Sequence, residues 1–244
     1  MSRVGTALVI AHRGASAREV ENSLAAFRAA AALGADAVEL DIHATADGGL
    51  IVHHDETIAG RPISQLTTAA AVAERLANGE SVPTLAAALD ALGRRLQVFV
   101  EVKSLPTEFD DRLLATLDEG PNPRGYAIHG FDHRIVARLG RKRPALRRGV
   151  LSASYPVDPL AGPRDAGATI LWQERTLVDQ ALAEALHGAG MQLFVWTVDD
   201  PAEMRHLLEL GVDGLCTNRP DRGRAAVGGR RGAAGAAPGA EGAP

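Results

Sequence analysis

Two spacings of apolar residues alternate along the chain. Short runs rich in Val, Ile and Leu, such as residues 7–12 and 97–103, are typical of buried strands. Between them lie segments rich in Ala and Leu, such as residues 23–33, where Leu24 and Phe27 are about one helical turn apart. Strands that alternate with helices over the whole chain indicate a parallel sheet covered on both faces.

The number of strand–helix units favours a closed barrel. An open doubly wound sheet shares the alternating pattern, but about eight units fit an α/β fold of the (β/α)8 TIM barrel type. The length of 244 residues is also close to that of one such barrel. The predicted strands cover residues 7–12, 37–41, 50–54, 97–103, 126–129, 148–151, 169–172, 193–197 and 214–217. The predicted helices cover residues 23–33, 69–77, 85–92, 109–117, 135–139, 177–186 and 202–210.

Two segments depart from the alternation. Residues 56–82 form a short insertion after the second strand, and from about Arg222 onward the composition turns to Gly, Ala, Arg and Pro. Such a tail buries too little apolar surface to offset its ordering entropy, so we expect it to be disordered. The chain is thus predicted to consist of a barrel domain, residues 1–221, and a disordered tail, residues 222–244.

Composition and charge narrow the functional classes. The net charge of -4 gives no support for nucleic acid as a partner, because a surface that follows phosphates needs a basic excess. The single cysteine, Cys216, excludes an intramolecular disulfide and favours a reducing compartment. The first residues lack the features of a signal peptide, and no apolar run is long enough for stable membrane insertion. A cytoplasmic protein is expected, and the oligomeric state is left open.

Polar residues fall where buried strands should end. In β/α barrels the active site lies at the C-terminal ends of the strands, and charged or imidazole groups occur near several predicted ends. Glu39 and Asp41 are two residues apart on one strand, so both point to the same side. Together with Glu101 on a later strand they would repel one another unless a cation neutralises them. Oxygen ligands suit Mg²⁺ or Ca²⁺ better than zinc.

Several motifs in order resemble those of the glycerophosphodiester phosphodiesterase family. They are HRG, ENSLAAF, GADAVELDIHATADGGLIVHHD, EVK, HGFDH and FVWTVDDPAEMRHLLELGVDGLCTNRPD, and together they extend from Val9 to Asp221. The resemblance implies a TIM barrel that uses a divalent metal ion to hydrolyse a small-molecule phosphodiester, giving sn-glycerol 3-phosphate and an alcohol.

The resemblance also implies a role for each matching residue. The catalytic histidines would be His12 and His54, and the metal ligands would be Glu39, Asp41 and Glu101. The positions that match substrate-binding residues of the family, or residues beside them, are Arg13, Lys103, Trp196, Glu21 and Asn22.

The chemistry of a phosphodiester agrees with these residue types. Hydrolysis needs charge neutralisation on the phosphoryl oxygens, a base for the attacking oxygen and an acid for the leaving oxygen. Two histidines suit the last two tasks near neutral pH, and the sequence leaves open which is the acid. It also leaves open whether water or a substrate hydroxyl attacks.

Two alternatives share the same barrel. One is a related phosphodiesterase for lysophospholipids or sphingolipids, and the other is a barrel that binds phosphodiesters without turnover. The family usually has Pro where this chain has Val20, and the insertion over residues 56–82 is short, so the alcohol headgroup is not indicated.

Overall fold

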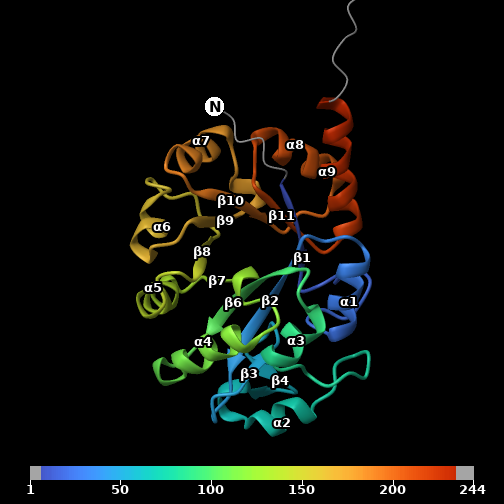
Figure 1. Ribbon diagram of the computed structural model, residues 1–244, viewed down its shortest axis with the longest axis vertical. Helices are drawn as coiled ribbons and strands as arrows, with labels where there is room; N and C mark the ends of the chain where they lie inside the picture. The colour runs from blue at the N-terminus through green and yellow to red at the C-terminus, as the bar shows by residue number, and fades with distance from the viewer. Residues whose placement is uncertain (1–6, 235–244) are drawn as a thin grey trace, which may run out of the picture.

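Eight parallel strands form a closed barrel within residues 7–234, the part of the chain that the computed structural model describes (Figure 1). Each strand pairs with the next, and the last strand returns to the first through the register Leu8↔Gly214. The TIM barrel predicted from the sequence is therefore confirmed. The barrel strands are β1 (Leu8–His12), β2 (Ala37–Ala44), β6 (Gln97–Ser104), β7 (Tyr126–His129), β8 (Arg147–Ser152), β9 (Ile170–Glu174), β10 (Gln192–Trp196) and β11 (Gly214–Thr217).

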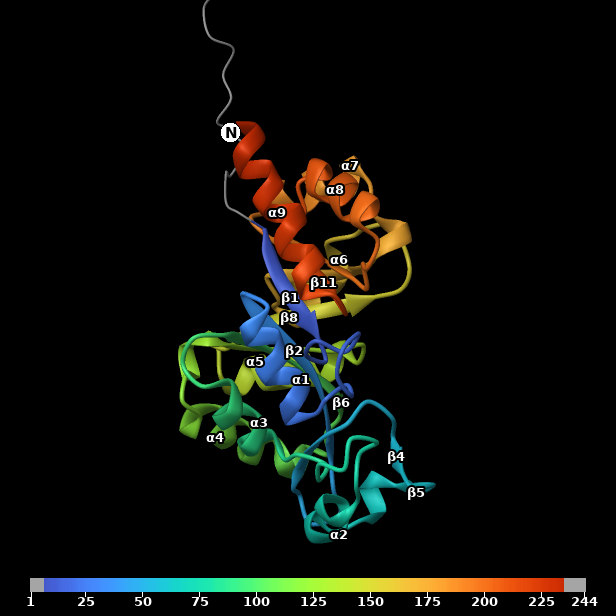
Figure 2. The same cartoon turned by 90° about the vertical axis from the view of Figure 1, so that its right-hand side faces the viewer.

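Helices between the strands cover the outside of the barrel (Figures 1 and 2). The first begins where the Ser23 side chain accepts a hydrogen bond from the Ala26 amide, and Gly34 follows its end with a positive φ of 77°. Within residues 7–234 the helices of the barrel are α1 (Leu24–Ala32), α3 (Leu85–Leu92), α4 (Asp110–Glu119), α5 (His133–Lys142), α6 (Ala161–Ala166), α7 (Gln180–Gly188), α8 (Pro201–Leu210) and α9 (Pro220–Ala234).

Alternation along each strand separates an outer core from the barrel interior. In β2, Val38 and Leu40 belong to the core between the strands and the helices. The residues between them, Glu39 and Asp41, therefore point into the barrel. The interior below them is filled by Phe99, Trp172 and Phe194, whose ring centroids lie 5.0 to 5.4 Å apart in edge-to-face contacts. The lower barrel is thus a packed core.

The insertion after β2 forms a small lobe beside the barrel (Figure 2). It contains β3 (Leu50–Val52), β4 (Thr57–Ile58), β5 (Arg61–Pro62) and α2 (Thr68–Ala73), around a small core of its own. The extended run predicted for residues 50–54 is present as β3, but it is not a strand of the barrel. The turn at Gly48, with φ 79°, reverses the chain, so β3 pairs antiparallel with β2 and lies outside the ring of eight.

The helix α9 corrects the predicted boundary of the tail. Disorder was expected from residue 222, but Pro220–Ala234 is helical, and the remainder, residues 235–244, lies outside the described residues. Val227 is buried in the core beside β1, and Arg224 forms an ion pair with Asp36 at 2.6 Å. The composition suggested disorder because the segment contains few apolar residues. In the structure, Val227 and Ala226 pack against the core beside β1.

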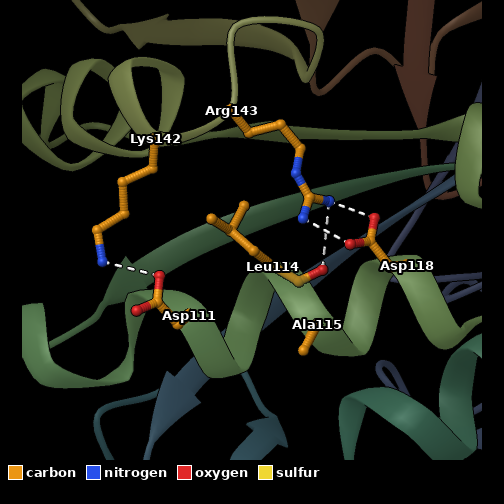
Figure 3. Close-up of a pocket in the computed structure, with 6 residues that line it drawn as sticks. All are labelled: Asp111, Leu114, Ala115, Asp118, Lys142 and Arg143. Atoms are coloured by element: carbon orange, nitrogen blue, oxygen red, sulfur yellow. Dashed lines mark hydrogen bonds and ion pairs between the residues drawn. The ribbon is translucent and has the colours of Figure 1, made fainter.

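Ion pairs join two of the outer helices across a surface groove (Figure 3). Lys142 of α5 lies 2.9 Å from Asp111 of α4, and Arg143 pairs with Asp118. The charges balance, and exposed pairs of this kind contribute little to stability. The groove is therefore a helix–helix contact. Within residues 7–234, no helix combines the length and apolar character needed to cross a bilayer.

Candidate active site

A cavity of about 120 Å³ opens at the C-terminal ends of the barrel strands. Of the residues predicted for the site, those lining it are His12, Arg13, Glu39, His54, Glu101, Lys103 and Trp196. These come from β1, β2, β6 and β10 and from the segment after β3, so the closure of the barrel gathers residues that are far apart in the sequence. Asp41, Glu21 and Asn22 do not line the cavity, but each of them contacts Arg13.

Three buried carboxylates give the cavity its electrostatic character. Glu39, Asp41 and Glu101 are 2%, 0% and 7% exposed. Burial, together with the charge of Asp41 and of Glu101, raises the pKa of Glu39 well above its ordinary range. Burial and the charge of Asp41 likewise raise the pKa of Glu101 to about 7. A bound cation would stabilise the ionised form of both carboxyl groups.

Asp41 is neutralised by basic residues. Its Oδ2 lies 3.1 Å from Arg13 Nε and accepts a hydrogen bond of 2.8 Å from Asn22 Nδ2, and Lys103 Nζ lies 3.3 Å from Oδ1. Burial acts to raise the pKa of Asp41, but Arg13 and Lys103 outweigh it and the pKa is lowered. Among the described residues, the buried Oδ1 has the contact with Lys103 and no further donor, so it keeps a lone pair for a ligand.

The tightest group of possible metal donors differs in one member from the predicted set. One donor atom each from Glu39, Glu101 and His129 lie within 4.8 Å of one another, and all three side chains are buried. Asp41 lies outside that group. His129 ends β7 beside Glu101 in the register of the sheet.

His12 is held in one orientation by a chain of hydrogen bonds. Asn218 Nδ2 donates to Asp199 Oδ2 at 2.7 Å, which turns its Oδ1 toward His12 Nδ1, 2.7 Å away. Since an amide oxygen only accepts, Nδ1 carries the proton and the lone pair of a neutral ring is on Nε2. Burial and the charge of Arg13 lower the pKa of His12, which favours this neutral form.

His54 is held at the rim of the same cavity. Its Nδ1 lies 2.8 Å from Asp55 Oδ1, and its side chain is 36% exposed. The carbonyl oxygen of His54 lies 3.1 Å from Nε2 of His43, whose Nδ1 lies 3.2 Å from Ser104 Oγ. His43 thus fixes the backbone that carries His54, and the ring of His54 is oriented by its neighbour in the sequence.

The segment after β1 places Arg13 by an unusual backbone conformation. Arg13 and Asn22 have positive φ values of 54° and 56°, and the Arg13 amide donates to Glu39 Oε2 at 3.2 Å. Both oxygens of Glu21 accept hydrogen bonds of 3.0 Å from Arg13 Nη1. Asn22, 1% exposed, binds Asp41. Glu21 therefore orients Arg13, and Asn22 orients Asp41. The substrate contacts predicted for Glu21 and Asn22 stay a prediction.

Aromatic rings border the mouth of the cavity. Trp196 Nε1 donates to the carbonyl oxygen of Trp172 at 3.1 Å, which fixes the ring that the sequence predicted at this place. Phe131 packs edge-on against Trp196 with centroids 5.6 Å apart and is 50% exposed. An exposed aromatic edge suits the less polar part of a ligand.

Three residues of this arrangement were not assigned a role from the sequence: Phe131, Asp199 and Asn218. Phe131 stands in the HGFDH motif, and Asp199 and Asn218 stand in the last motif, so a signal was present. What they contact depends on which strands are neighbours in the barrel.

The fold and the site define a class. A (β/α)8 barrel whose mouth combines buried carboxylates, two oriented imidazoles and an arginine has the equipment of a metal-assisted acid–base hydrolase. Residues 12–222 match the model of the Glycerophosphoryl diester phosphodiesterase family, and the chain belongs to this family.

Relatives in sequence and in structure agree with this membership. A glycerophosphodiester phosphodiesterase from Caldanaerobacter subterraneus subsp. tengcongensis is 32% identical over 88% of this chain and 95% of its own. A probable glycerophosphodiester phosphodiesterase 2 from Mycobacterium tuberculosis is 30% identical over 90% of each chain. The crystal structure of a glycerophosphodiester phosphodiesterase from Parabacteroides distasonis has a TM-score of 0.84 and 26% identity, covering 93% of this chain and 98% of that one.

Proposed function

We propose that the chain hydrolyses glycerophosphodiesters to sn-glycerol 3-phosphate and an alcohol, in the cavity at the barrel mouth and with a divalent metal ion. The observation that carries the proposal is the pair of imidazoles, His12 and His54. Each is held at Nδ1 by a side-chain oxygen, and both face a cavity that also contains buried carboxylates.

The donor set fits a divalent cation. Glu39, Asp41 and Glu101 would hold it, because all three carboxyl groups are buried close together and because Glu39 and Glu101 resist ionisation without a cation. When bound, the ion supplies neutralisation of the charge on the phosphoryl oxygens. Carboxylate oxygens alone would favour Mg²⁺ or Ca²⁺. Arg13 and Lys103 line the same cavity and add positive charge for the phosphate.

The two histidines divide the proton transfers. His12 accepts the proton of the attacking oxygen at Nε2, since its Nδ1 is engaged with Asn218 and its lowered pKa leaves the ring neutral at pH 7. His54 then donates a proton to the leaving oxygen. The arrangement serves an attacking water or an attacking hydroxyl of the substrate equally. The alcohol portion packs at the aromatic border formed by Trp196 and Phe131.

The test is release of glycerol 3-phosphate from a panel of glycerophosphodiesters with different alcohols, after EDTA treatment and after restoring single divalent metals. Metal-dependent release supports the proposal, and the panel ranks the alcohols. Turnover of lysophospholipids or sphingolipids alone would move the substrate to that class. Binding of diesters without turnover in any metal would leave a non-catalytic barrel.

A further inference from the structure

His129 is a buried titratable side chain that the proposed mechanism does not use. It is 1% exposed, and within residues 7–234 its Nδ1 has no hydrogen-bond partner. Its Nε2 lies 3.8 Å from Glu39 Oε1, which is too long for a hydrogen bond. A buried polar atom without a partner is costly, and the cost calls for an explanation such as a ligand that binds there.

The surroundings of the ring fix its orientation toward the carboxylates. The imidazole stacks on the indole of Trp172 with centroids 4.3 Å apart and planes 9° apart. A stacked ring presents only its edge, where the nitrogens are. His129 is paired with Glu101 across β6 and β7, and it lines the cavity with Glu39. The stack and the strand register therefore hold the ring edge beside both carboxylates.

The spacing of the donor atoms suits a single ion. Bonds from a divalent ion to nitrogen or oxygen are about 2.0–2.6 Å long. Donor atoms that lie within 4.8 Å of one another can therefore share one ion placed between them. A neutral imidazole offers a metal ion a lone pair on one nitrogen, whereas carboxylates offer only oxygen atoms.

We propose that His129 is a ligand of the metal ion together with Glu39 and Glu101, and that the site consequently prefers first-row transition-metal dications to Mg²⁺ and Ca²⁺. The proposal rests on the metal-dependent function proposed above and revises the ion expected from the carboxylates alone. Its basis is general ligand chemistry, because an imidazole nitrogen favours transition metals and adds little for Mg²⁺ or Ca²⁺.

The test compares metal binding by the full chain and by His129→Gln without substrate. After EDTA treatment and its removal, isothermal titration calorimetry gives the affinities for Mn²⁺, Co²⁺, Mg²⁺ and Ca²⁺. We expect His129→Gln to weaken Mn²⁺ and Co²⁺ binding by roughly 10- to 100-fold and to change Mg²⁺ and Ca²⁺ binding much less. The matched control is His206→Gln, an exposed histidine on α8. Equal transition-metal affinities for the full chain and His129→Gln would overturn the proposal.

A second measurement needs no variant that might fold poorly. In the full chain loaded with Mn²⁺, electron spin echo modulation from a coordinated imidazole nitrogen is expected. Its absence from bound Mn²⁺ would overturn the assignment of His129.

The two proposals fail in different ways. If hydrolysis requires a metal but His129→Gln binds every metal as the full chain does, only the role of His129 is wrong. If the full chain binds no divalent ion and releases no glycerol 3-phosphate, the proposed function is wrong as well.

Discussion

The two ends of the barrel interior both hold charged side chains, but the surroundings of those side chains differ. At the N-terminal end, Arg147 of β8 donates hydrogen bonds of 2.8 Å from Nη1 to Gln97 and from Nη2 to Gln192. Its guanidinium carbon lies 5.2 Å from the ring centroid of Phe99 and 5.9 Å from that of Phe194. Among the described residues no carboxylate contributes to its electrostatics, and burial lowers its pKa. This cation is satisfied by neutral groups and by packing.

At the C-terminal mouth, three buried carboxylates lie close together instead, with Arg13 and Lys103 as their basic partners. Glu39 and Glu101 line the cavity, and within residues 7–234 the buried His129 Nδ1 lacks a hydrogen-bond partner, while Arg13 Nε and Asp41 Oδ1 have only ion-pair contacts at 3.1 and 3.3 Å. Such groups cost stability unless a ligand completes them. The contacts at the N-terminal end therefore stabilise the fold, whereas the groups at the C-terminal mouth are suited to binding a ligand.

Substitutions of the histidines at the C-terminal mouth should have the largest effect on activity and should leave folding intact. His12→Gln and His54→Gln each remove a proton-transfer group, so kcat should fall by about 10²- to 10⁴-fold. The measurement is release of glycerol 3-phosphate beside thermal unfolding, with His206→Gln as control. If kcat of both variants stays within about threefold of that of the unsubstituted chain, the loss is far smaller than the one expected for an acid or a base. The assignment of His12 and His54 as acid and base is then wrong.

At the N-terminal end of the barrel, a substitution should lower stability and leave activity unchanged. Arg147→Met leaves the amide oxygens of Gln97 and Gln192 without their donor, so the free energy of unfolding should fall by about 2 kcal/mol. That corresponds to a decrease in Tm of roughly 4–8 °C. The values of kcat and KM measured well below Tm should not change. The control is Arg134→Met, whose side chain is 90% exposed and whose loss should shift Tm little. A loss of activity in Arg147→Met without a loss of stability would remove the contrast between the two ends.

A feature of the fold or of the site can be predicted from the sequence when it depends on residues that are near one another along the chain. Glu39 and Asp41 were placed correctly inside the barrel because the period of two along a strand decides which side they face. The closed barrel followed from the count of strand–helix units. These predictions needed no knowledge of which strands are neighbours.

The parts that were missed depend on tertiary pairing or on a few packed residues. Residues 50–54 look like any apolar run, and only the hairpin with β2 shows that β3 lies outside the ring. Asn218 and His12 are separated by more than two hundred positions and meet because β11 pairs with β1. In α9, Val227 is buried in the core although the composition of the segment is typical of disorder.

A smaller effect should follow from releasing His12 without removing it. Asn218→Ala deletes the acceptor at Nδ1, so the ring can rotate or change tautomer, and kcat should fall by about 10- to 100-fold. KM and metal affinity should stay close to those of the unsubstituted chain, because the carboxylates are untouched. Asn78→Ala on the exposed insertion serves as the control. A change in KM alone would assign Asn218 to substrate binding.

The smallest effect tests whether the mouth is strained by its own charge. With the metal removed, Glu101→Gln should raise the free energy of unfolding at pH 8 by about 1–2 kcal/mol, since one pKa unit corresponds to about 1.4 kcal/mol. The folded carboxyl has its pKa raised to about 7, above its ordinary value, so its ionisation destabilises the fold increasingly from its unfolded pKa up to pH 7. Loss of the contact with Lys103, 2.9 Å away, offsets part of the gain.

The gain in stability from Glu101→Gln should accompany a loss of metal binding, which calorimetry measures on the same samples. Glu108→Gln, an exposed position after β6, should change neither quantity. The pH dependence separates the charge from other effects of the substitution, because the difference between Glu101→Gln and the unsubstituted chain should shrink as the pH falls below 7. A variant that is less stable at pH 8 would mean that Glu101 supports the fold through Lys103. The mouth would then resemble the opposite end in one respect, because its charged groups would also stabilise the fold.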